Sequence, residues 1–435
     1  MDPGPVKIFT IKDVPRLRYI CELILGDILG LSWLIVTDKR KLGKNPVINY
    51  SNDDIKSSFM ITPHELLYES GITNITPSVT DWKGLPVFFQ TRENSDIPFD
   101  IFAASFYLVT RYEEYLDFEP DRHGRFKASN SIAFRNGFLL KPVIDLWAKE
   151  LAKSLLMKFQ TLTFRRNTYG AIFTMDIDQP FEYLGKDIFR AIGGFIKELG
   201  HNSEKVNERY RTLARGEKDP WDVFDFVLEM IRKYNTDTRF FIPTGDRSEY
   251  DRNPSWHNED YRKLIIKISK GCKIGLHPSV EASQNIKILG KEKLRLQEII
   301  PGDITMNRFH FIKMRFPFAY RNLANTGFTE DYSMGFPEEP GFRAAIARPF
   351  YFYDVLEDKK TDLKIIPFQV MDMTLMEYRK LSPESSDEII ISIINDIKRV
   401  GGLFVSLWHN TSLLETGEFI KWRRTFENML KLQQP

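Results

Sequence analysis

Residues 170–435 alternate between short apolar runs and helix-like stretches, and this alternation constrains the fold more than any other feature of the chain. Repeated strand–helix units predict a parallel sheet with helices on its faces, most simply a barrel or a distorted barrel. We therefore expect an α/β fold. The predicted strands are residues 171–176, 239–245, 273–277, 308–314, 342–347, 363–372 and 402–409, and the predicted helices are residues 187–199, 222–234, 261–270, 290–300 and 387–401.

The first part of the chain has a different pattern. An amphipathic helix is predicted over about residues 15–30, short strands over 32–38 and 46–51, and further helices over 100–116 and 143–159. A chain of 435 residues is too long for one ordinary core. We expect a smaller N-terminal α/β domain of unknown role over residues 1–160 and a barrel over residues 161–435. His123 is interpreted as a solvated loop histidine.

The composition excludes several classes of protein. The 61 basic and 59 acidic residues leave a net charge of +2, which gives no electrostatic basis for nucleic-acid binding. Cys21 and Cys272 are the only cysteines, so no disulfide framework or cysteine-rich zinc site can form. The first 20 residues contain no apolar h-region with a small-residue cleavage site, so we expect no secretion signal, and the apolar segment near residues 20–36 contains Glu22 and Asp27. We expect a cytoplasmic protein without a membrane span.

Three short motifs follow apolar runs: TMDID at 174–178, GLHPS at 275–279 and LWHN at 407–410. Side chains at the carboxyl ends of parallel strands converge on one rim, and aspartates with histidines there predict a divalent-metal site. Asp176 and Asp178 share a face if the strand stays extended. Each motif also has a plainer interpretation: the Asp pair as a helix cap, His277 as a cap or core residue, and His409 as a buried hydrogen-bonded histidine.

In their order and spacing these motifs resemble the polysaccharide deacetylase family, the group related to the nodulation chitooligosaccharide deacetylase. TMDID resembles its aspartate-rich motif, GLHPS its metal-binding histidine motif, and Leu407-Trp408-His409 its late Leu-x-His motif. The segments RFHF, DYSMGF, GFR and ARPFYFYD, together with DIFAASFYLVTRYEEY in the first part, resemble a bacterial subgroup that carries an N-terminal domain of unknown role. The resemblance implies a distorted (β/α) barrel.

The resemblance also implies the metal ligands and the catalytic base. Asp176 would be the base, with Asp178 and His277 as metal ligands. The family's second metal histidine, four residues further on, is replaced here by Glu281. Either Glu281 or His310 would complete the site, and we favour His310 because we expect the segment HPSVEAS to turn into a loop or a helix, where a glutamate is more often solvated.

The remaining family roles fall to an arginine and a histidine. The arginine that orients the base would be Arg308 or Arg343, with Arg315 as a third candidate in that order. His409 matches the general acid that protonates the leaving amine. Trp408, Phe350 and Tyr351 are candidates for stacking on a sugar ring or for the core.

The expected function is therefore that of a metal-dependent hydrolase that removes an N-acetyl group from an amino sugar in a glycan or a glycan precursor. Mixed nitrogen and oxygen ligands favour zinc as the divalent cation, with nickel, cobalt and manganese as alternatives. Two other functions stay open: hydrolysis of a non-sugar amide by the same site, and a catalytically impaired protein that binds glycan or a partner. The substrate would be a carbohydrate or a small molecule, and the sequence indicates no oligomeric state.

Overall fold

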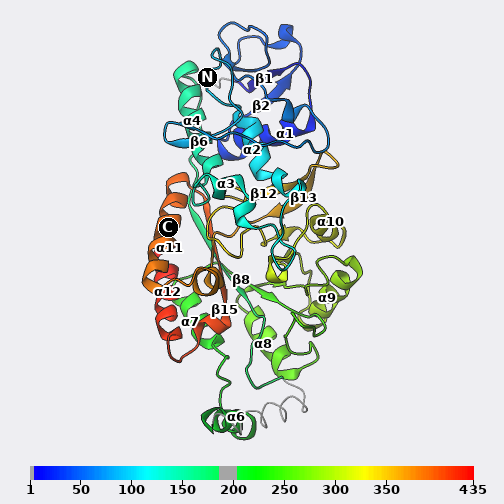
Figure 1. The fold of residues 1–435 in the computed structure, drawn as a ribbon, viewed down its shortest axis with the longest axis vertical. Coiled ribbons are helices and arrows are strands. Elements are labelled where there is room, and N and C mark those ends of the chain that lie inside the picture. The colour runs from blue at the N-terminus through cyan, green and yellow to red at the C-terminus, as the bar shows by residue number, and fades with distance from the viewer. Residues whose placement is uncertain (1–3, 186–202) are drawn as a thin grey trace.

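A computed structural model describes residues 4–185 and 203–435. Figure 1 shows an elongated molecule with the N-terminal half, which comprises residues 4–169, at one end and the large sheet of the second half, residues 170–435, toward the other. The N-terminal half contains a four-stranded parallel sheet in the order β2-β1-β3-β4. Its strands are β1 (Val6–Thr10), β2 (Trp33–Val36), β3 (Val47–Tyr50) and β4 (Phe59–Met60).

The helices of this half are largely those that the sequence predicts. α1 (Pro15–Cys21) continues directly into a π-helical segment, Glu22–Ile28, and α4 (Val143–Lys158) is the longest helix of this half. Every residue of α2 (Ile101–Val109) is buried, and Asp100 caps the helix by accepting from two backbone N–H groups of its first turn. Short elements complete this half: β5 (Thr80–Trp82), β6 (Leu85–Val87) and α3 (Ile132–Arg135).

The second half is built on a nine-stranded sheet in the order β12-β13-β11-β10-β9-β8-β7-β15-β14. Only the β12–β13 pair is antiparallel. The strands are β7 (Gly170–Asp176), β8 (Thr238–Ile242), β9 (Lys273–Leu276), β10 (Met306–Asn307), β11 (Glu330–Asp331), β12 (Phe350–Asp354), β13 (Lys359–Ile365), β14 (Val370–Met371) and β15 (Leu403–His409). The mixed α/β architecture is therefore confirmed.

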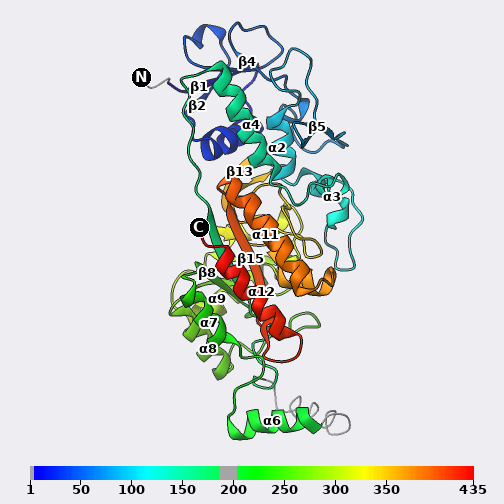
Figure 2. The same ribbon diagram turned by 90° about the vertical axis from the view of Figure 1, so that its left-hand side faces the viewer.

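Helices follow most of these strands along the chain. Figure 2 shows α11 and α12 beside β15, and α6 projecting from the end of the molecule opposite the N-terminal half. The helices are α6 (Ser203–Arg215), α7 (Phe224–Lys233), α8 (Glu259–Ser269), α9 (Ile286–Ile299), α10 (Phe318–Asn325), α11 (Pro383–Val400) and α12 (Phe419–Leu432). The helix expected over residues 187–199 lies outside the described residues.

One short segment joins β13 and β14, the two strands at the ends of the parallel part of the sheet. β13 pairs with β11 through Ile365 and Asp331, and β14 pairs with β15 through Val370 and Ser406. Residues 366–369 join the two strands. No pairing closes the parallel part of the sheet into a continuous ring of strands within residues 4–185 and 203–435, so a closed barrel is not seen.

Two predicted strands are wrong, and a third, over residues 363–372, is divided between the end of β13 and β14. In the stretch 308–314, residues 310–312 form a 3₁₀ turn in which Phe311 and Ile312 have positive φ, so the chain cannot stay extended there. Residues 342–347 form a turn with Ala345 at φ 56°. Strands β11 and β12, which follow these two stretches, were not predicted.

One apolar core runs through both halves. Arg343 forms an ion pair with Glu114 (Nη2–Oε2, 2.6 Å), and Arg348 forms one with Asp145 (Nε–Oδ1, 2.6 Å). Each pair joins the N-terminal half to the second half. The predicted boundary at residue 160 falls between α4 and β7, and it remains a prediction. None of the described helices is long and apolar enough to cross a membrane.

Candidate metal centre

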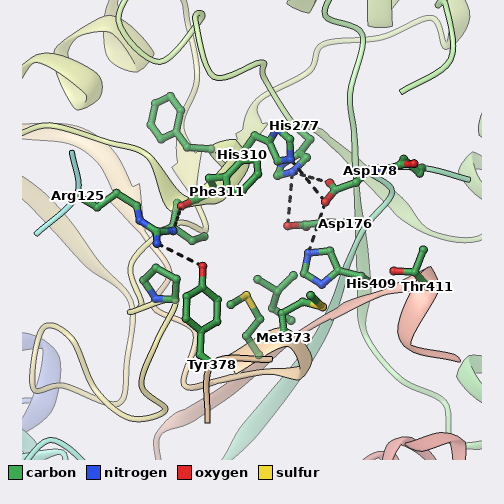
Figure 3. A pocket seen from close by; sticks show the side chains of 16 residues that line it. Arg125, Asp176, Asp178, His277, His310, Phe311, Met373, Tyr378, His409 and Thr411 are labelled. Carbon is green, nitrogen blue, oxygen red and sulfur yellow. Dashed lines mark hydrogen bonds and ion pairs between the residues drawn. The ribbon is translucent and has the colours of Figure 1, made fainter. Parts of the chain in front are cut away.

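The polar residues of the three motifs meet at the carboxyl ends of neighbouring parallel strands. Asp176 ends β7, and it lies opposite His409, the last residue of β15. His277 directly follows β9, and Arg308 directly follows β10. Because these strands run in the same direction, their ends deliver the side chains to one rim. Figure 3 shows the carboxylates of Asp176 and Asp178 directed toward the imidazoles of His277 and His409.

Asp178, His277 and His310 form a group that could hold a metal ion, because their ligand atoms all lie within 4.8 Å of one another. His277 Nε2 lies 3.0 Å from Asp178 Oδ1, and His310 Nε2 lies 3.6 Å from Asp178 Oδ2. His310 reaches the group from the turn after β10, although this stretch is not the strand that the sequence predicts.

Each imidazole of the site is fixed through its Nδ1 atom. His277 Nδ1 lies 2.7 Å from the carbonyl oxygen of Arg308, His310 Nδ1 lies 2.8 Å from Asp251 Oδ1, and His409 Nδ1 lies 2.8 Å from Asp372 Oδ1. A carbonyl oxygen only accepts, so the proton of a neutral His277 lies on Nδ1 and its Nε2 lone pair faces Asp178. Two acceptors at 3.0 Å require a proton or a cation between them.

The charge balance of the site favours a cation. Burial alone lowers the pKa of His310, but the carboxylates of Asp178 and Asp251 raise it to about 9. Burial likewise opposes the charge of His409, and Asp372, followed by Asp178 and Asp176, raises its pKa to about 10. Burial acts to raise the pKa of Asp178, yet His310 and His277 hold it well below its usual range. The carboxylates thus stabilise positive charge at this position.

The donor set fits a divalent cation. Asp178 Oδ1 and His277 Nε2 are buried atoms without a hydrogen-bond partner, although both are polar. Buried polar atoms are nearly always paired in proteins, so two unpaired acceptors at one point indicate a ligand. Two imidazole nitrogens and a carboxylate oxygen are ligands that zinc and its transition-metal neighbours accept, with an open position for water or substrate.

Asp176 lies beside this group and next to a buried arginine. Its Oδ2 is 3.8 Å from His277 Nε2, and its Oδ1 is 3.7 Å from Arg308 Nη1. Arg308 is fully buried between the rings of Phe241 and Phe368, and none of its guanidinium nitrogens has a hydrogen-bond partner. Burial lowers the pKa of Arg308. Asp176 is the carboxylate that lies against this guanidinium, so Arg308 is positioned to orient Asp176.

Asp251 and Asp372 are site residues that the sequence reasoning missed. Asp372 directly follows β14, and its two oxygens accept from the backbone N–H and the Nδ1 of His409. Asp372 could have been found from the sequence, because it is a carboxylate at the end of the predicted strand 363–372. Asp251 lies in the long loop after β8, and no periodic pattern in this loop marks it as a site residue.

The structure does not bring the other candidates to the site. Arg343 was the second candidate for orienting the base, but its guanidinium is occupied by Glu114 and by the carbonyl oxygen of Gly335, which makes it a contact between the two halves. Glu281 and Arg315 are exposed, and neither lines the pocket beside the metal group.

The aromatic candidates are also elsewhere. Trp408 is buried against Phe426, which makes it a core residue. Phe350 is buried in β12, and Tyr351 carries Lys360 over its ring; neither lines the pocket.

A pocket of about 270 Å³ opens beside the metal group. One side is apolar, with Ile312, Pro337, Met371, Met373 and Leu407 in its wall. Besides Asp176, His409 and the metal group, four polar side chains line the pocket: Arg125, Gln179, Tyr378 and Thr411. Arg125 belongs to the N-terminal half, where the sequence indicated no functional constellation.

Comparison with protein families and curated proteins gives short matches. A model described as "Family of unknown function (DUF7033)" matches residues 6–160, which is less than half of the chain. A UBX domain-containing protein 7 homolog from Dictyostelium discoideum is 29% identical over 86 residues, which are 18% of this chain and 17% of that protein. The chain therefore spans only a small part of that relative.

The structural neighbours include polysaccharide deacetylases. A protein from Mycobacterium smegmatis designated a polysaccharide deacetylase aligns at 16% identity over 61% of this chain and 84% of its own, with a TM-score of 0.39. A mutant of a CE4 family pseudoenzyme with restored enzymatic activity aligns at 10% identity over 61% and 64%, with a TM-score of 0.30. A 4-alpha-glucanotransferase from Thermococcus litoralis aligns at 11% identity over 62% and 37%, with a TM-score of 0.33. Similarities of this size do not establish a shared activity.

Proposed function

We propose that this protein is a metal-dependent hydrolase that removes an N-acetyl group from an amino sugar in a glycan or a glycan precursor. The observation that carries the proposal is the orientation of three imidazoles. His277, His310 and His409 are each held through Nδ1, and each directs Nε2 toward Asp178 at 3.0, 3.6 and 3.8 Å. Such an arrangement prepares nitrogen ligands for a cation and leaves a separate acid nearby.

Asp178, His277 and His310 would hold the cation, with zinc as our first choice. A bound divalent cation would supply Lewis-acid chemistry, in which an amide carbonyl is polarised and the proton of a nearby water is more easily lost. Both imidazoles would be kept oriented by hydrogen bonds at Nδ1. Asp251 holds His310, and the carbonyl oxygen of Arg308 holds His277.

Asp176 is the proposed general base. Its carboxylate lies beside His277 and against the guanidinium of Arg308, so it can accept a proton from a water in the pocket while it remains oriented. Arg308 would act through Asp176, since its own charge is buried and directed at that carboxylate.

His409 is the proposed general acid. Its pKa of about 10 keeps the imidazole protonated at neutral pH, and Asp372 fixes the ring so that Nε2 faces the pocket. Protonation of the departing amine by His409 would complete the cleavage of the amide bond. The apolar wall of Met371, Met373 and Leu407 would receive the methyl group of the acetyl.

Two alternatives share this site. Hydrolysis of a non-sugar amide would use the same residues. A catalytically impaired binding protein was suggested by the absence of a histidine four residues after His277. Because His310 supplies a second imidazole to the group, that reason no longer applies, and we do not favour this alternative.

Metal analysis of the purified protein tests the proposal, with His277→Ala and the matched surface variant Glu281→Ala beside it. We expect about one equivalent of transition metal in the wild type and in Glu281→Ala, and loss of the metal in His277→Ala. Metal-loaded protein should then release acetate from chitooligosaccharides or from a nucleotide-linked N-acetylated amino sugar. Failure to bind zinc, nickel or cobalt after reconstitution would refute the site. Metal binding without acetate release would reject the deacetylase activity alone.

A further inference from the structure

A turn from the N-terminal half reaches the metal pocket. Pro120 pairs with Phe126 across this turn, and Gly124 provides the positive φ of 78° that the reversal requires. The carboxylate of Asp121 accepts from the backbone N–H groups of His123 and Arg125 and from Arg125 Nε at 2.7 Å. The turn is therefore internally braced, and the side chain of Arg125 is held in one orientation.

Arg125 contacts the segment that carries a metal ligand. Its Nη1 donates to the carbonyl oxygen of Phe311 at 2.7 Å, and Phe311 is the residue after His310. Its Nη2 donates to the hydroxyl of Tyr378 at 3.3 Å. Arg125 is only 5% exposed although it lies in a turn, and it lines the pocket beside the metal group. Figure 3 shows its guanidinium directed toward Tyr378 and Phe311.

The segment that Arg125 holds has an unfavourable backbone. Phe311 and Ile312 both have positive φ, 56° and 53°, and a β-branched residue such as Ile312 rarely adopts this conformation. Such residues persist only where their surroundings impose the conformation. Within the second half, the turn is fixed by the Ile312 N–H to Phe309 carbonyl bond (3.0 Å) and by the contact of His310 with Asp251.

From the N-terminal half, two contacts add to these. The hydrogen bond from Arg125 fixes the Phe311 peptide, and the ring of His123 lies 5.4 Å from the ring of Phe311. The direction in which the chain leaves His310 is thus set partly by the braced turn of residues 120–126. His310, the first residue of this turn, directs its Nε2 toward Asp178.

We propose that Arg125 is a positioning residue of the metal site, and that the N-terminal half completes this site by holding the His310–Ile312 turn. The inference rests on the proposed metal-binding function and adds to it a role for residues outside the second half. Arg125 would not touch the cation. It would act through the Phe311 carbonyl on the position of the His310 imidazole.

The test compares metal affinity and cobalt absorption in full-length variants. Arg125→Ala should weaken zinc binding by at least about 10-fold, measured against a chromophoric chelator, and should reduce the intensity of the visible cobalt(II) bands. Arg348→Ala is the matched control, because Arg348 is also a largely buried arginine that joins the two halves, through Asp145, and it does not line the pocket. This control should leave both readouts unchanged at a comparable loss of thermal stability.

A second variant keeps the inference testable if Arg125→Ala folds poorly. Asp121→Asn keeps Arg125 but weakens the brace that orients it, and we expect a several-fold loss of zinc affinity. Wild-type affinity and an unchanged cobalt spectrum in the folded variants would overturn the inference while the metal site stands. No metal binding by the wild type itself would instead overturn the proposed function, and this inference with it.

Discussion

Asp372 gives the most direct test of the electrostatics of the site. Both of its oxygens are used by His409: Oδ2 accepts from the backbone N–H at 2.7 Å, and Oδ1 lies 2.8 Å from Nδ1. Asp372 is itself fully buried, so its charge acts on His409 with little screening by water. Asp372→Asn removes this charge and keeps the size of the side chain and its ability to accept one hydrogen bond.

The expected change in pKa is large. The pKa of His409 is about 10, against about 6.5 for an ordinary histidine, which corresponds to about 5 kcal/mol in favour of the imidazolium at about 1.4 kcal/mol for each pKa unit. Asp372 is the main carboxylate that offsets the effect of burial. In Asp372→Asn we expect the pKa to fall below about 8, so that at pH 8 at most about half of the imidazole carries a proton.

NMR titration of the histidine side chains in metal-free protein measures this pKa, with signals assigned through His→Gln variants. Asp251→Asn is a matched control, because Asp251 makes the same kind of carboxylate contact at 2.8 Å with His310. It should lower the pKa of His310 from about 9 and leave that of His409 near its wild-type value. A His409 pKa that stays above about 9 in Asp372→Asn would refute the assignment and leave Asp176 and Asp178 as the source of the effect.

Two further predictions follow from the same geometry. The variant Asp176→Asn should keep its metal, because Asp176 is outside the ligand group, and its turnover should fall by about 10²–10⁴-fold if Asp176 is the general base. Metal analysis measures the first result and an acetate-release assay the second. Full activity of the variant would exclude Asp176 as the base. His310 and His409 have raised pKa values of about 9 and 10, so their contribution to stability is present in full below about pH 6.5 and is lost as the pH rises through these values. The unfolding free energy of metal-free protein should therefore fall between about pH 6.5 and pH 10, and a flat profile in urea titrations would contradict this.

The polar residues at the rim of the sheet could be predicted from the sequence, because their positions depend only on where short apolar strands end. Asp176, His277 and His409 each end or follow an apolar run, and parallel strands bring such positions together whatever their separation in the chain. His310 was favoured over Glu281 for a similar reason, and it lies in the ligand group. The predicted strand around His310 was nevertheless wrong, because the pattern of apolar residues does not reveal the positive φ of Phe311 and Ile312.

Contacts between distant segments could not be predicted. Arg308 and Arg343 have similar apolar neighbours in the sequence, so the sequence does not show which of them reaches the site. Arg343 is kept away by its ion pair with Glu114, which lies 229 residues from it in the chain. The roles of Asp251, Asp372 and Arg125 depend in the same way on residues that the chain brings near only when it is folded. The identity of the metal, the substrate and the cellular compartment remain predictions.

The ion pair between Glu114 and Arg343 has a consequence for synthesis. During translation Glu114 meets Arg111 three residues away at once, with Arg111 Nε donating to Oε1 at 2.8 Å. Its second guanidinium partner, Arg343, leaves the ribosome 229 residues later, and both side chains end almost fully buried. Without Arg343 a buried Glu114 would keep only one of its two guanidinium partners, and incomplete pairing of a buried charge is destabilising, so the nascent N-terminal half cannot bury Glu114 in its final surroundings until most of the sheet has been made. The sequence divides into two parts, but the N-terminal half reaches its final structure only together with the second half.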